Sequence, residues 1–182
     1  AFDCIALEQE MEKIPQEYNR VHVDILNASC APSEVMKLMR GKKFEVHLMI
    51  EHPDEALSVW RETGAEKIII QHEETKVRDL QADLGVALRL ETPLGVLAEY
   101  RGLEFVQLMS IAQIGEKGHR FEEKVFARAR ALREKYPYIK IQLDGGVRLE
   151  LIAMIQEVGV SSCVVGAHIG EFDHAIFARK KS

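Results

Sequence analysis

The sequence predicts an α/β fold of the (β/α)8 barrel type, formed as a single domain by residues 1–182. Short, apolar, β-prone runs alternate with helical patterns in units of roughly 25 residues. Most of these runs contain few polar residues, which is typical of parallel strands covered by helices. No long linker or composition break divides the chain, and 182 residues with 47% hydrophobic content can bury one core.

The expected elements follow one another along the chain. The predicted strands are residues 21–26, 44–50, 67–71, 84–89, 104–109, 138–143 and 161–165. The predicted helices lie near residues 4–14, 33–40, 53–63, 92–101, 121–135, 148–158 and 171–179. Residues 74–83 are expected to contain a weaker, single-turn helix. Pro53 suits the first turn of its helix and Gly64 lies just past the end of it.

Repeated βα units favour a closed barrel over a doubly wound open sheet. The GxGxxG motif is absent, which weakens the dinucleotide-binding alternative. Only seven strands are predicted, and the chain opens on a helical pattern. We therefore expect the first strand of the barrel to be missing from this chain, through truncation or processing of the N-terminus.

Composition limits the binding partners and the cellular compartment that we expect for this protein. The net charge of −5 and the lack of a basic stretch argue against nucleic-acid binding. No apolar run approaches the roughly 20 residues of a membrane span, and no secretory signal is recognisable. Cys4, Cys30 and Cys163 are odd in number and lack CxxC spacing, which indicates reduced thiols in the cytoplasm and argues against a cysteine zinc site.

Ionisable residues interrupt three of the apolar strands. His22 and Asp24 are two residues apart, so they point to the same side of their strand. His47 lies in the next strand, and Asp144 lies where a later strand runs into two glycines. Because burying such groups is costly unless they pair or bind a metal, these four residues indicate a shared site.

Several motifs, in order and at nearly matching spacing, resemble the ribulose-phosphate 3-epimerase family of ribulose-phosphate-binding barrels. They are HVDIL (22–26), EVHLMIEHP (45–53), GVAL (85–88), ETP (91–93), VQLMS (106–110), LDGGV (143–147) and VGA (165–167). The resemblance extends from about residue 3 to the end of the chain. No single motif decides it, but the ordered set is fairly specific.

The resemblance implies a metal-assisted isomerase. The matching positions imply one divalent ion held by His22, Asp24, His47 and Asp144, and mixed imidazole and carboxylate ligands suit zinc, iron, manganese or cobalt. It also implies that Asp24 and Asp144 are the catalytic acid/base pair, acting on opposite faces of the sugar. The implied reaction is epimerisation at C3 of a ketopentose phosphate, between D-ribulose 5-phosphate and D-xylulose 5-phosphate.

Phosphorylated sugar is thus the expected partner, and its phosphate needs a binding site. Barrels of this class hold phosphate on backbone N–H groups of the last two βα loops and a short helix N-terminus. Gly145, Gly146, Gly166 and Ala167 are at the matching positions, although Ala167 replaces the serine usual in the family. We expect a helix starting near residues 168–171 to point at this pocket.

Two alternatives remain open at the level of sequence. One is a related sugar-phosphate decarboxylase or aldolase, which the lack of lysine in residues 45–50 disfavours. The other is a non-catalytic barrel kept as a binding or structural protein, because residues 112–120 replace the family's PGFGGQ loop and residues 27–32 form a shortened connection. Family members often assemble, so a homo-oligomer also stays open.

Overall fold

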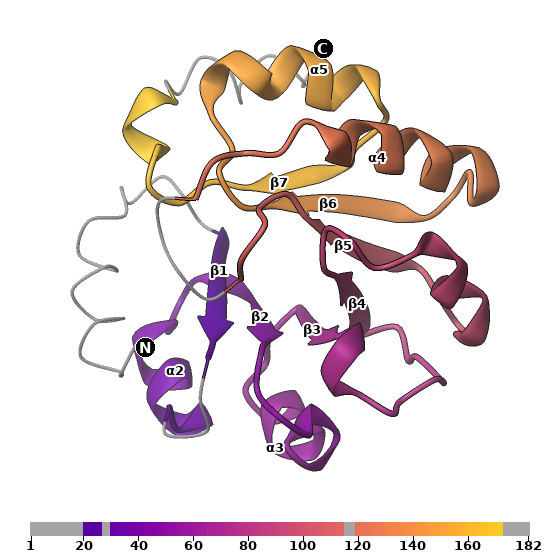
Figure 1. Ribbon diagram of the computed structural model, residues 1–182. Helices are drawn as coiled ribbons and strands as arrows, with labels where there is room; N and C mark the ends of the chain where they lie inside the picture. Colours follow the sequence, from indigo (N-terminus) through magenta and orange to yellow (C-terminus); the bar gives the residue numbers. More distant parts are fainter. Residues whose placement is uncertain (1–19, 27–29, 115–118, 173–182) are drawn as a thin grey trace.

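Seven parallel strands form one curved sheet in the computed structural model, which describes residues 20–26, 30–114 and 119–172 (Figure 1). The strands pair in chain order from β1 to β7. They are β1 (Arg20–Ile25), β2 (Lys43–Leu48), β3 (Lys67–Gln71), β4 (Leu84–Leu88), β5 (Phe105–Met109), β6 (Lys140–Asp144) and β7 (Ser162–Val164). The sheet curls into a nearly closed barrel, so the predicted α/β barrel class and all seven predicted strands are confirmed.

The helices lie between the strands on the outside of the sheet (Figure 1). The α-helices are α2 (Pro32–Leu38), α3 (Leu57–Arg61), α4 (Lys124–Lys135) and α5 (Ile152–Glu157). The 3₁₀ turns are η1 (Pro53–Glu55), η2 (His72–Glu74), η3 (Leu94–Glu99), η4 (Leu149–Leu151) and η5 (Ile169–Glu171). Within the described residues, no helix is both long and apolar enough to cross a membrane.

Two of the expected helices take other forms. The α-helix predicted near residues 92–101 is the short 3₁₀ helix η3, which begins after Pro93 and contains Gly95, a poor helix former. Within residues 74–83, where a single-turn helix is predicted, the only helical residue is Glu74, which ends the 3₁₀ turn η2. The rest of the segment is irregular, with an isolated bridge between Asp79 and Arg101 and a turn that leads into β4. The predicted helix near residues 4–14 and most of that near 171–179 lie outside the described residues.

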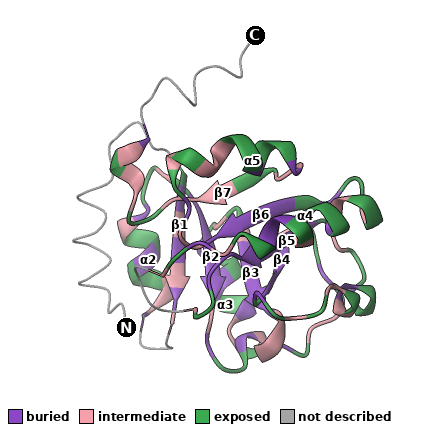
Figure 2. Ribbon diagram, turned by 45° about the horizontal axis from the view of Figure 1, so that its top comes forward, coloured by how far each residue is buried: buried purple, intermediate pink, exposed green. Residues whose placement is uncertain are grey.

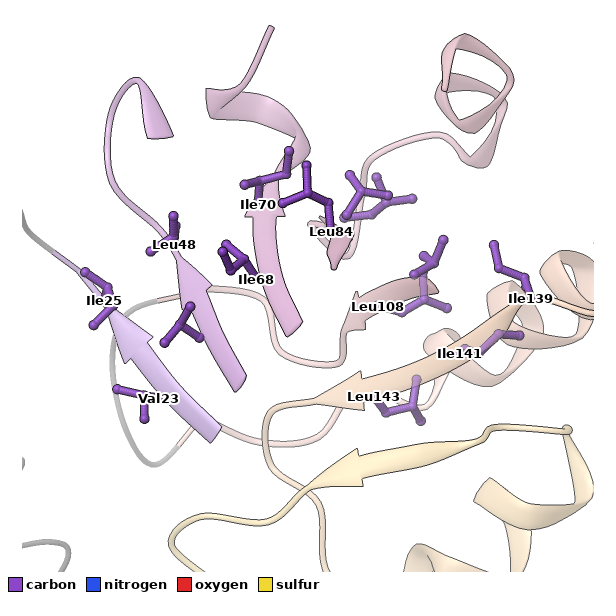
Figure 3. Packing of buried hydrophobic residues seen from close by; sticks show 14 of the residues in the cluster. Val23, Ile25, Leu48, Ile68, Ile70, Leu84, Leu108, Ile139, Ile141 and Leu143 are labelled. Carbon is purple, nitrogen blue, oxygen red and sulfur yellow. The ribbon is translucent and has the colours of Figure 1, made fainter. Parts of the chain in front are cut away.

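The main hydrophobic core lies between the sheet and the helices. Alternate residues of β1 are buried, with Val21, Val23 and Ile25 on the outer face, while the residues between them face the barrel interior. The cluster joins such strand residues to helix residues such as Val125 and Trp60. Figure 3 shows part of this layer, and in Figure 2 most of the strands are buried while much of α4 and α5 is exposed.

The inside of the barrel is filled differently. Ile69, Ala87 and Phe105 form a second, small apolar cluster. Gly85 is required there, because a Cβ on it would come 2.5 Å from Cδ1 of the Phe105 ring. Most other buried inward-facing positions of β2, β5 and β6 are polar, namely Glu45, His47, Gln107, Gln142 and Asp144. They leave the interior to a hydrogen-bonded site.

Candidate metal and proton-transfer site

Strand register brings the four predicted metal ligands together. In the parallel pairing of β1 with β2, Asp24 lies beside His47 and His22 lies beside Glu45. Asp144 is the last residue of β6, and the curvature of the sheet carries it across the interior to within 3.7 Å of His22 Nε2. His22, Asp24, His47 and Asp144 therefore converge from three strands at the carboxyl end of the barrel.

The four side chains match the spacing of a metal site. One ligand atom from each lies within 4.8 Å of the other three. Asp24 Oδ1 is 3.2 Å from His22 Nε2 and 3.4 Å from His47 Nδ1, and Asp144 Oδ2 is 3.7 Å from each of these nitrogens. Bonds of about 2.0–2.2 Å around a tetrahedral ion separate its ligands by about 3.3–3.6 Å. The cluster could therefore hold a divalent ion with little rearrangement.

Each histidine has a polar partner on the ring nitrogen that faces away from the cluster. Nδ1 of His22 lies 2.8 Å from Oε1 of Glu45, and Nε2 of His47 lies 2.9 Å from Oε1 of Gln71. Both partners offer oxygen, so each ring can donate its N–H outward and turn a lone pair inward. His22 then presents Nε2, whereas His47 presents Nδ1.

The electrostatics of the cluster favour positive charge between the carboxylates. Desolvation opposes charge on Asp24, but hydrogen bonds from His22 and His47 hold the pKa of Asp24 well below its usual range. Burial lowers the pKa of His47, yet hydrogen bonds with Asp144 and Asp24 raise it to about 8. The pKa of His22 is raised well above 6.5 by Asp24 and Glu45, against the effect of burial. Protons or a metal cation can supply this charge.

Two glutamines, which the sequence motifs did not single out, form hydrogen bonds to the cluster and to Glu45 from inside the barrel. Gln107 donates from Nε2 to Asp144 Oδ2 at 2.8 Å, and Gln142 donates to Glu45 Oε1 at 2.6 Å and to Gln107 Oε1 at 3.2 Å. The signal was present, because Glu45 is two residues before His47 and Gln142 two residues before Asp144, on the same strand faces.

The predicted phosphate loops lie side by side. Gly145 and Gly146 follow β6, and Gly166 and Ala167 follow β7, which is the neighbouring parallel strand. Gly146 adopts a φ of +66°, and a Cβ there would lie 2.7 Å from the backbone nitrogen of Phe121. Both loops are therefore at the carboxyl end of the barrel, with the loop after β5 packed against the first.

The turn predicted to face this pocket is η5, a single 3₁₀ turn. Its Glu171 carboxylate contacts Nη2 of Arg148 at 3.3 Å and Nδ1 of His168 at 3.0 Å, and it accepts a long hydrogen bond from the backbone N–H of Leu149 at 3.4 Å. The charge of Glu171 is thus compensated by the Arg148 guanidinium and by its contacts with His168 and the start of η4. Asp173, the next acidic residue along the chain, lies outside the described residues.

Comparison with solved structures supports the barrel architecture. Thiamine phosphate pyrophosphorylase from Pyrococcus furiosus superposes with a TM-score of 0.52 at 15% sequence identity, covering 90% of this chain and 79% of that one. At this identity the similarity shows a shared fold alone.

Sequence comparison is more specific. The chain is similar to ribulose-phosphate 3-epimerase of Eremothecium gossypii, with 28% identity over 82% of this chain and 74% of the relative. It is also 28% identical to the Aquifex aeolicus enzyme of that name, over 91% and 83% of the two chains, and 25% identical to that of Schizosaccharomyces pombe, over 93% and 83%. The profile of the Ribulose-phosphate 3 epimerase family matches residues 1–170. The chain therefore belongs to the ribulose-phosphate 3-epimerase family of isomerases.

Proposed function

We propose that this protein epimerises C3 of a ketopentose phosphate and interconverts D-ribulose 5-phosphate and D-xylulose 5-phosphate. The observation that carries the proposal is the convergence of two histidines and two aspartates from β1, β2 and β6, in a chain of the epimerase family. Epimerisation at a carbon next to a ketone needs removal of a proton from one face and delivery of a proton to the other.

Asp24 and Asp144 supply the two proton carriers in this proposal. They approach from different strands, β1 and β6, with ligand-type atoms within 4.8 Å of each other. The Asp24 side chain is 38% exposed and that of Asp144 only 9%, so Asp24 lies closer to solvent. One aspartate, as the carboxylate, accepts the C3 proton, and the other, as the carboxylic acid, donates a proton to the opposite face of the same carbon.

The cofactor in this proposal is one divalent ion, zinc, iron, manganese or cobalt, held by His22, Asp24, His47 and Asp144. When bound, such an ion polarises the neighbouring ketone oxygen and so makes the C3 proton more acidic. Glu45 and Gln71 hold the two imidazoles so that each turns a ring nitrogen toward the cluster.

The phosphate of the sugar would be bound by backbone N–H groups of Gly145, Gly146, Gly166 and Ala167. Their loops follow adjacent strands at the same end of the barrel as the ionisable cluster. Glycine permits close approach of backbone to an anion. Pairing of Glu171 with Arg148 and His168 reduces the repulsion that its carboxylate would exert on phosphate.

The deciding experiment incubates the purified protein, supplied in turn with each of the four metals, with D-ribulose 5-phosphate in heavy water. We expect D-xylulose 5-phosphate that carries deuterium at C3, as detected by NMR. Release of carbon dioxide or cleavage of a carbon–carbon bond would indicate a decarboxylase or aldolase instead. Metal binding without any turnover or exchange would favour the non-catalytic barrel.

A further inference from the structure

Whether His47 can bind a metal ion through Nδ1 depends on which of its ring nitrogens carries the proton. Nδ1 faces Asp24 at 3.4 Å, whereas Nε2 faces Gln71 Oε1 at 2.9 Å. An imidazole that offers a lone pair on Nδ1 must carry its proton on Nε2. Nε2 of Gln107, which can only donate, lies 3.0 Å from Nδ1 and requires the same tautomer of a neutral ring.

The amide of Gln71 cannot by itself enforce this tautomer. A glutamine side chain carries a donor group and an acceptor oxygen of nearly equal shape, and either could face the imidazole. Its NH₂ group donates to Oε2 of Glu73 at 2.5 Å. A carboxylate only accepts, so Glu73 turns the NH₂ group of Gln71 toward itself and the amide oxygen toward His47.

Glu73 is in turn fixed from the opposite side. Its Oε1 accepts hydrogen bonds from the Thr92 hydroxyl and, at 3.2 Å, from the backbone N–H of Arg89. Desolvation would raise the pKa of Glu73, but the hydrogen bonds from Thr92 and Gln71 lower it below its usual range, so it stays ionised at neutral pH. Donors therefore converge on both carboxylate oxygens of Glu73.

We propose that Glu73 is a positioning residue for the metal site, which acts through Gln71 to hold His47 in the tautomer that presents Nδ1 to a divalent cation. This inference rests on the proposed metal site. It makes the two histidines unlike, since His22 is oriented directly by the carboxylate of Glu45, whereas His47 is oriented through an intervening amide.

The test uses Glu73→Gln. The backbone N–H of Arg89 can only donate, so the new amide turns its oxygen toward Arg89 and its NH₂ group toward Gln71. The Gln71 amide then turns over and presents its NH₂ group to Nε2 of His47. This opposes a proton on Nε2 and shifts the tautomer population toward Nδ1–H, against the Gln107 donor that faces Nδ1. We expect zinc affinity, measured by competition with a chromophoric chelator, to fall about 10- to 100-fold. The ¹⁵N shifts of His47 in metal-free protein at alkaline pH should report the tautomer change.

A double variant distinguishes positioning from a merely structural role. Exchanging the two side chains, in Gln71→Glu/Glu73→Gln, places a carboxylate directly on His47 and an amide donor behind it. Zinc affinity and the Nε2–H tautomer should both return toward the wild-type values. Glu74→Gln is the matched control, because Glu74 is the next residue in the chain and accepts from Nη2 of Arg89 at 2.8 Å. This variant should change neither measurement.

Unchanged zinc affinity and an unchanged His47 tautomer in Glu73→Gln would overturn the inference, as would failure of the double variant to restore either. A wild-type protein that bound no zinc would overturn it as well. A wild type that binds zinc and shows these tautomer changes, yet fails to interconvert the two pentulose phosphates, would refute the proposed activity while leaving the role of Glu73 standing.

Discussion

At the scale of single residues, the site depends on pairs that share a strand face. His22 and Asp24 come from one strand, and Glu45 and His47 come from the next. The parallel register sets His22 beside Glu45 and Asp24 beside His47. The same alternation that lets one strand carry two ligands therefore also provides one ligand with a carboxylate partner.

Replacing either proposed proton carrier should stop proton exchange. In Asp24→Asn and in Asp144→Asn, the amide keeps the shape of the side chain but cannot accept and return a proton near neutral pH. We expect exchange of the C3 proton in heavy water to be abolished, with thermal unfolding close to that of the wild type. Metal content must be measured in parallel, and wild-type exchange in a variant would remove that aspartate from the acid/base role.

Replacing Glu45 by glutamine should weaken metal binding without leaving a cavity in the barrel interior. Glu45→Gln keeps the volume of the side chain but replaces the carboxylate, whose Oε1 accepts from His22 Nδ1 at 2.8 Å, by a neutral amide. We expect metal affinity to fall about 10- to 100-fold by chelator competition. Glu104→Gln, a change of the same kind outside the cluster, serves as the control. Equal affinity in wild type and Glu45→Gln would mean that Glu45 does not orient the ligand.

At the scale of elements, each strand separates two environments. The outward residues of β6, Ile141 and Leu143, are both fully buried against the helix layer, while Gln142 and Asp144 face inward. The outer face supplies hydrophobic stabilisation, and the inner face supplies hydrogen bonds. Changes on the two faces should therefore have separable effects on stability and on metal binding.

Truncation on the outer face should cost stability. Ile141 has no exposed surface, so Ile141→Ala leaves a cavity and should lower the free energy of unfolding by about 2–5 kcal/mol. Tyr138, three residues earlier, is 98% exposed, and Tyr138→Ala should change the free energy by less than about 0.5 kcal/mol. Urea denaturation measures both, and similar values for the two variants would contradict the assignment of the outer core.

Replacing a glycine by alanine should affect stability differently in the two glycine loops. Gly146→Ala introduces a side chain at a φ of +66° and 2.7 Å from the Phe121 nitrogen, so it should destabilise the fold. Gly166→Ala meets nothing within 4 Å and should leave the unfolding temperature unchanged. If phosphate binds at this loop as proposed, Gly166→Ala should raise KM more than it lowers kcat. An unchanged KM would argue against a role of Gly166 in binding.

At the scale of the whole molecule, a bound ion would connect distant parts of the chain. Its proposed ligands extend from residue 22 to residue 144 and join β1, β2 and β6. An ion that binds only the folded state adds stability that grows with the logarithm of its concentration relative to its Kd, about 2.7 kcal/mol at 100 times its Kd. We expect zinc to raise the unfolding temperature and a chelator to reverse the effect. His47→Ala should lose this response, and a zinc effect that persisted in it would place the ion elsewhere.

Much of the architecture could be predicted from periodicity. The seven strands and the helices near α2, α3, α4 and α5 follow from apolar runs that alternate with helical patterns. Residues 92–101 deviate, since a glycine after a proline-led start weakens the α-helical pattern there. Residues 74–83 deviate because tertiary pairing of Asp79 with Arg101 outweighs a weak local helix preference.

The sequence by itself determined the strand order, the ligand types and, through the resemblance, the four residues proposed to meet at one site. Local patterns suffice for this, because alternation along a strand decides which residues share a face. Only the tertiary structure decided which polar side chains in the barrel interior form hydrogen bonds with one another. Glu45 meets Gln142 across 97 positions of sequence, and Glu73 reaches His47 through Gln71. Such contacts depend on the curvature of the nearly closed sheet and on side-chain orientation, which no local pattern encodes.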